Sequence, residues 1–82
     1  RSEKLDIKPE TTLKDVRIGA RLGSDGRTYV FVFNSNEREA RTGEIRFKVG
    51  AGDVTLPVNL PPFDFRIAVL PRLGESAATW WP

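Results

Sequence analysis

Hydrophobic and polar residues alternate along most of this chain, which is the pattern of strands that bury one face. Over residues 15–22, Val16, Ile18, Ala20 and Leu22 occupy every second position, and arginine or glycine lies between them. A period of two predicts a half-buried β-strand. Further strands of this kind are predicted over residues 44–49, 54–60 and 63–70, with a short one over 4–8. No window has the spacing of an amphipathic helix.

The segment 28–33 departs from the alternation, because it is apolar on both faces. Its alternate positions put Tyr29, Phe31 and Phe33 on one face and Val30 and Val32 on the other. A strand in the middle of a sheet that is covered on both sides needs no polar face. We therefore predict that residues 28–33 form an inner strand and that the aromatic side chains belong to the core.

Turn residues separate the predicted strands. Gly26 lies in the segment 23–27, where glycines allow the chain to reverse as a hairpin. Pro61 and Pro62 fix φ at two successive positions and predict an extended link between sheets. Asn34 ends the apolar run, and its side chain is expected to hydrogen-bond nearby backbone where the strand opens into a loop. These four residues are given structural roles.

Short strands at intervals of about ten residues, joined by glycine and proline turns, are typical of a small all-β domain. We predict an antiparallel β-sandwich of about six or seven strands. Residues 1–82 form one domain, with a core over about 13–71 and a tail over 72–82, and residues 9–12 are interpreted as a turn. The chain starts with Arg1 and without an initiator methionine, so we expect it to be a fragment of a larger chain.

Composition excludes several kinds of chemistry. The chain has no cysteine and no histidine, which excludes a disulfide, a thiolate nucleophile and histidine-dependent acid–base or zinc chemistry within it. Glu44, Asp53 and Asp64 are interpreted as solvated surface carboxylates, because they lie in turns or between apolar strand positions. We expect no catalytic residue, no metal and no cofactor in this chain.

Trp80 and Trp81 are the candidate binding residues, because an aromatic face can stack on a sugar ring. Adjacent residues of a strand point to opposite faces, so at most one of the two would serve a single site. The alternative is that they pack on the sandwich or on a neighbouring domain.

A nucleic-acid-binding barrel is the third interpretation. Outward arginines near aromatic residues could form such a surface. The formal net charge is only +2, however, and the basic residues do not form a run. We therefore expect no nucleic-acid partner, and the interrupted hydrophobic pattern predicts no membrane partner.

The order of these segments resembles the C-terminal accessory β-sandwich domains of β-galactosidase-type glycoside hydrolases. Residues 29–37, YVFVFNSNE, are similar to the strand pattern "YLFVxNxNxE" of such domains. Residues 45–47 match its "VxF" strand in kind, and residues 60–70 match its closing "LPPxxxxIxxL" segment. The resemblance covers about residues 13–71 and leaves the tryptophans outside.

The resemblance implies a non-catalytic accessory domain that packs against and stabilises the catalytic domain of a glycoside hydrolase. In those enzymes the two catalytic carboxylates belong to the catalytic barrel, so no acidic residue of this chain inherits their role. The expected partner is therefore the catalytic domain of the same protein, with carbohydrate as a further expected ligand. An independent carbohydrate-binding module that uses Trp80 or Trp81 is the alternative.

Overall fold

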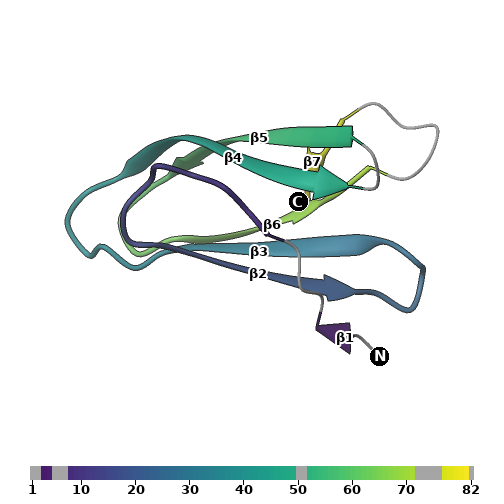
Figure 1. Cartoon of the computed structure of the whole chain (residues 1–82). Coiled ribbons are helices and arrows are strands. Elements are labelled where there is room, and N and C mark those ends of the chain that lie inside the picture. Colours follow the sequence, from purple (N-terminus) through teal and green to yellow (C-terminus); the bar gives the residue numbers. More distant parts are fainter. Residues whose placement is uncertain (1–2, 5–7, 50–51, 72–76, 82) are drawn as a thin grey trace.

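The computed structural model describes residues 3–4, 8–49, 52–71 and 77–81, which fold into seven antiparallel strands in two sheets (Figure 1). The strands are β1 (Glu3–Lys4), β2 (Val16–Leu22), β3 (Thr28–Asn34), β4 (Arg41–Val49), β5 (Gly52–Leu60), β6 (Phe65–Val69) and β7 (Thr79–Trp80). One sheet has the order β1-β2-β3-β6-β7, and the hairpin β4-β5 forms the other. This confirms the predicted all-β sandwich. None of the described residues forms a helix that could cross a membrane.

Five of the strands overlap the predicted segments. The extended link predicted at Pro61 and Pro62 is wrong, because residues 61–64 form a turn, and β6 therefore begins at Phe65 instead of residue 63. The start of a strand differs most at β4. This strand begins at Arg41 instead of Glu44, because Arg41 to Gly43 pair with the end of β5 although their side chains do not alternate. In the predicted short strand over 4–8, residues 5–7 lie outside the described part of the chain. The predicted tail contributes β7, which pairs with β6.

The interpretation of residues 9–12 as a turn is wrong. Glu10 forms an isolated antiparallel bridge with Arg46, and both backbone hydrogen bonds between these residues measure 2.8 Å. The Thr11 hydroxyl donates a hydrogen bond to the Glu44 carbonyl oxygen at 2.8 Å. The segment therefore runs along β4 and covers part of its edge, which satisfies backbone groups that an open edge strand would expose.

The core lies between the two sheets. Figure 1 shows β4 and β5 as one layer over β2, β3 and β6. The buried residues that pack together in this core cluster come from both layers, and they are Val30, Val32, Ile45, Phe47, Leu56, Val58, Leu60, Ala68 and Leu70. Complete burial of one of the valine, leucine, isoleucine or phenylalanine side chains contributes about 1.5–3 kcal/mol to the stability of the fold.

The aromatic residues of β3 are not part of this core. Val30 and Val32 are fully buried, and Tyr29, Phe31 and Phe33 are half-buried on the opposite, outer face of the sheet. The alternation and the inner position of β3 between β2 and β6 were predicted correctly. The assignment of the aromatic side chains to the core was wrong, because the valines are the residues that face β4 and β5.

Asn34 is the buried polar residue at the end of β3, where the chain crosses between the layers. Its Nδ2 donates to the carbonyl oxygens of Glu39 at 2.9 Å, Pro61 at 3.1 Å and Leu60 at 3.4 Å. Its Oδ1 accepts a hydrogen bond from the Asn36 backbone N–H at 3.0 Å. Glu39 lies in the β3–β4 crossover and Pro61 in the β5–β6 crossover, so one amide holds both connections between the sheets. The predicted local bond is confirmed.

Asp15 holds the beginning of β2 to the same crossover. Its Oδ2 accepts hydrogen bonds from Arg41 Nη2 at 2.8 Å and from Asn36 Nδ2 at 3.1 Å. The hydrogen bond from Asn36 and the adjacent Arg41 guanidinium lower the pKa of the Asp15 carboxyl. The backbone carbonyl of Asp15 accepts two further bonds from Ser35, from its N–H and its hydroxyl, each at 2.8 Å.

At the opposite end, a hairpin turn joins β2 and β3. Gly26 has a φ of 81°, which lies in the region that glycine adopts without strain. The Tyr29 hydroxyl donates a hydrogen bond of 2.6 Å to Asp25 Oδ2. This bond raises the pKa of Tyr29 and lowers the pKa of Asp25. The hairpin predicted over residues 23–27 is confirmed.

Replacement of Asn34 by alanine is expected to lower the free energy of unfolding by about 2–4 kcal/mol, because buried carbonyl oxygens lose their donor. Urea unfolding followed by tryptophan fluorescence measures this. The control is Asn59→Ala, because Asn59 is exposed on β5 and its Oδ1 accepts one bond of 3.2 Å from Thr42. The control is expected to change stability by less than about 0.5 kcal/mol. Equal effects of the two substitutions would contradict the role of Asn34.

Acid is expected to weaken the Asp15 contacts. The pKa of Asp15 is lower in the folded chain than its ordinary value of about 3.9. The contribution of Asp15 to stability is therefore complete above the ordinary pKa and is lost as the pH falls through the lowered pKa of the folded state. Asp15→Asn is the matched variant, since asparagine tolerates the φ of 63° at this position. The difference in unfolding free energy between wild type and variant should shrink below about pH 4. A difference independent of pH would count against the ion pair.

Candidate functional site

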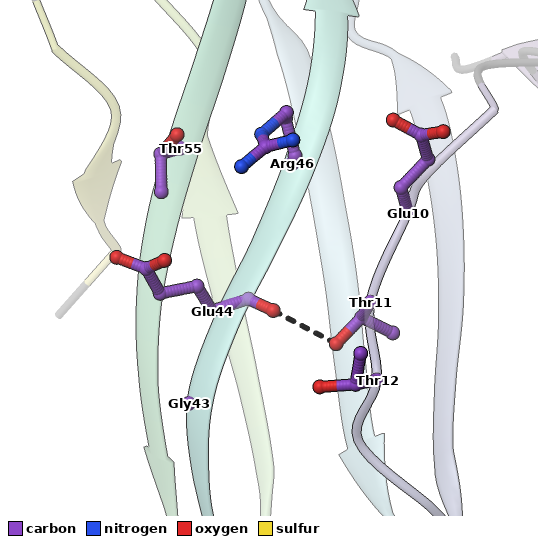
Figure 2. A pocket seen from close by; sticks show the side chains of 7 residues that line it. All are labelled: Glu10, Thr11, Thr12, Gly43, Glu44, Arg46 and Thr55. Atoms are coloured by element: carbon purple, nitrogen blue, oxygen red, sulfur yellow. Dashed lines mark hydrogen bonds between the residues drawn. The ribbon is translucent and has the colours of Figure 1, made fainter.

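A polar hollow between residues 10–12 and the β4–β5 hairpin is the first candidate (Figure 2). It has a volume of about 520 Å³, and Glu10, Thr11, Thr12, Gly43, Glu44, Arg46 and Thr55 line it. Figure 2 shows the side chains of Glu10 and Glu44 on opposite sides of β4. Most of the lining residues are exposed, and none is aromatic. The hollow therefore lacks the large hydrophobic and aromatic side chains that line a ligand pocket, and it lacks a converging pair of carboxylates.

The other candidate carboxylates do not come together either. Glu44 and Asp53 are exposed on the outer surface of the small sheet, and Asp64 is half-buried in the turn before β6. The described residues contain no group of three or more acidic side chains that could hold a metal ion. Their arrangement supports the interpretation of surface carboxylates.

The outer side of the five-stranded sheet carries a row of apolar side chains. Cross-strand pairing places Phe33 opposite Phe65, Phe31 opposite Ile67, and Tyr29 opposite Val69. Paired residues of antiparallel strands point to the same face. We call this surface the outer aromatic face, and it comprises Tyr29, Phe31, Phe33, Phe63, Phe65, Ile67 and Trp81.

Three of these side chains are strongly exposed. Phe63 exposes 60% of its surface, Trp81 54% and Phe65 49%. Rings on this face touch one another at an angle: Phe31 and Phe65 lie 6.0 Å apart with 44° between their planes. Phe33 and Phe63 lie 5.1 Å apart at 74°, edge to face. Exposed apolar side chains that gather on one face make that face a candidate interaction site.

Phe63 is held on this face by an unusual backbone conformation. It occupies the third position of the turn from Pro61 to Asp64, which the Asp64 N–H closes by a hydrogen bond of 3.3 Å to the Pro61 carbonyl. Its φ of 54° is that of a type II turn, where glycine or asparagine is usual. For a bulky residue this conformation is strained by about 1 kcal/mol or more. The turn therefore presents the Phe63 ring to solvent at a cost in backbone strain.

The two tryptophans lie on different sides of the sheet. Trp80 pairs with Ala68 and packs against the core, with the Arg66 guanidinium 5.1 Å from the centre of its ring. The N–H of Trp81 donates a hydrogen bond of 2.7 Å to the Ile67 carbonyl oxygen, and its side chain is exposed. Of the two tryptophans, therefore, Trp81 is the one that belongs to the outer aromatic face.

The four residues to which the sequence assigns structural roles lie at the ends of the sandwich. Gly26 is in the β2–β3 turn, and Asn34, Pro61 and Pro62 are at the two crossovers. They are distant along their strands from the centre of the outer aromatic face and act on its geometry only through the fold. Sequence reasoning missed Phe63 and Phe65 as surface residues.

Comparison with known proteins adds no family to this picture. No protein-family model matches the chain, and no curated protein or solved structure is significantly similar to it. The case for a function therefore depends on the geometry of the outer aromatic face.

The strain at Phe63 can be measured by comparing two substitutions. Phe63→Gly and Phe63→Ala both remove the ring contact with Phe33, but only glycine adopts the φ of 54° freely. The glycine variant is expected to be more stable than the alanine variant by about 1 kcal/mol in urea unfolding. An alanine variant of equal or higher stability would show that the turn is unstrained.

Proposed function

We propose that this chain is a non-catalytic accessory domain of a carbohydrate-active enzyme of the β-galactosidase type, and that it packs against the catalytic domain of that protein. The observation that carries the proposal is the outer aromatic face. Phe63, Phe65 and Trp81 are exposed together there, and burying them against a neighbour would release apolar surface from water.

The inward-facing half of the domain supports a structural role. The core between the sheets is filled by aliphatic side chains and Phe47, and Asn34 closes one end of it. The described carboxylates are dispersed, and the chain contains no histidine or cysteine to act as base or nucleophile. A compact domain with one apolar outer face is suited to bracing a neighbouring domain.

Carbohydrate binding at Trp81 is the second candidate, because its ring is exposed beside other aromatic residues. A sugar chain needs flat aromatic platforms with polar groups between them. The Phe31–Phe65 and Phe33–Phe63 pairs are tilted by 44° and 74°, which leaves an uneven surface. An irregular protein surface is more complementary to these tilted rings than a sugar chain is.

Phe65→Ser distinguishes a docking residue from a residue that only stabilises the isolated domain. In the isolated chain its effect on unfolding is expected to stay below about 1 kcal/mol, since half of the side chain is exposed. In the full-length protein the substitution should lower the unfolding free energy of this domain by about 1–3 kcal/mol, because the Phe65 ring is buried against the catalytic domain there. Hydrogen exchange of β3 peptides in increasing urea follows this domain within the larger protein.

Thr55→Ser is the matched control, because Thr55 is exposed on the outer surface of the other sheet. It should have no effect in either context. Equal effects of Phe65→Ser in the isolated and full-length proteins would overturn the proposal. A saturable change of tryptophan fluorescence with oligosaccharides, lost in Trp81→Ala, would favour the carbohydrate-binding module instead.

A further inference from the structure

The row of β2 residues beside the aromatic rings contains a gap. Gly19 pairs with Phe31, so it lies on the outer aromatic face in the middle of the strand. A Cβ atom placed on Gly19 would meet no heavy atom within 4 Å. Glycine is ordinarily disfavoured in the interior of a strand, where it often marks the close approach of another group. The result is a notch in the side-chain layer, with the backbone of Gly19 as its floor.

Two arginines flank the notch. Arg17 pairs with Phe33 and Arg21 with Tyr29, so both lie on the same face as Gly19 and are exposed. Within the described part of the chain, neither side chain forms an ion pair or a hydrogen bond. Arg41 differs, because its guanidinium contacts both Asp15 and Glu39. The outer aromatic face thus presents two cations without partners beside an apolar surface.

We propose that the notch at Gly19 receives the carboxylate of an Asp or Glu side chain from the domain that covers the outer aromatic face, and that Arg17 and Arg21 bind it. The inference rests on the proposed function and adds the chemistry of the partner surface. A guanidinium binds a carboxylate through two parallel hydrogen bonds. Exclusion of water by the neighbouring rings would strengthen this charge pair.

Charge complementarity favours a different protein surface over a second copy of this chain. Strands β2, β3, β6 and β7 contain no Asp or Glu, and Asp25 in the β2–β3 turn already accepts the hydrogen bond from the Tyr29 hydroxyl through its Oδ2. Two copies docked face to face would therefore bring four arginines together with few acidic partners, which opposes association. A neighbour with an acidic residue inside an apolar patch supplies what the face lacks.

A single-stranded nucleic acid is a weaker fit to the same residues. Its binding requires a groove of cations along several phosphates, and exposed ring faces on which the bases stack. Here the cations flanking the notch are Arg17 and Arg21, and the edge-to-face contact between Phe33 and Phe63 breaks up the platform. One clamped carboxylate matches two arginines around one notch.

Footprinting of the full-length protein and of the isolated chain tests the proposal. Hydroxyphenylglyoxal modifies accessible arginines, hydroxyl radicals oxidise accessible aromatic rings, and mass spectrometry locates both products. Arg17 and Arg21 should react about tenfold more slowly in the full-length protein than in the isolated chain, because each is hydrogen-bonded to the partner carboxylate. Arg46, exposed on β4, should react equally in both. Arg41 is held by Asp15 and Glu39, so its slow reaction in both the full-length protein and the isolated chain would confirm that the domain is folded in each.

Gly19→Val is the decisive variant, because it fills the notch without disturbing the fold. Its Cβ has open space, and valine is favoured in strands, so the isolated chain should remain at least as stable. In the full-length protein the variant should restore rapid modification of Arg17 and Arg21. Arg17→Gln combined with Arg21→Gln should increase oxidation of Phe65 and Trp81 there.

The outcomes separate this inference from the proposed function. If the rings are protected in the full-length protein but Arg17 and Arg21 react as in the isolated chain, the carboxylate clamp is wrong and the docking function remains. If neither rings nor arginines are protected, both are overturned. Protection of the two arginines in the isolated chain by single-stranded oligo-dT would also overturn the clamp and assign the face to phosphates.

Discussion

The side-chain amide of Asn34 is the contact on which the arrangement of this domain depends. It is fully buried, and it hydrogen-bonds the backbone of both connections that pass between the two sheets. Since a strand alternates its faces, an inward Asn34 also places Val32 and Val30 inward and the aromatic residues of β3 outward. A shift of the strand by one residue would reverse all of them and leave the amide in solvent. The same residue thus joins the layers and determines which side of the sheet is aromatic.

An aromatic outer face is costly for an isolated domain, and the structure contains further features that serve it. Phe63 adopts a strained φ and rests against Phe33, which adds an exposed ring to a surface that is already apolar. Strain of this kind persists where the surrounding structure enforces it and a function benefits. Arg17 and Arg21 keep the edge of the face charged without ion-pair partners in the described residues. Together these features are the basis on which we propose a protein neighbour for this surface.

Most of the strands could be predicted from the sequence, because alternation and turn residues are local signals. The position of the aromatic residues was misjudged, because hydropathy alone does not tell which side of a two-sided apolar strand meets the other sheet. The hairpin register contains the missing information: Val30 pairs with Ala20 and Phe31 with Gly19, so the valines share the apolar face of β2. The bonds from Asn34 to Leu60 and Pro61 could not be predicted, because they join residues far apart in the sequence.

We propose that another domain of the same protein covers the outer aromatic face. An electron cryomicroscopy structure of the full-length protein tests this most directly. We expect Phe63, Phe65 and Trp81 to be buried against the neighbouring domain, with an acidic side chain at Gly19. A structure in which the face points into solvent, or in which β4 and β5 form the domain contact instead, would contradict this docking.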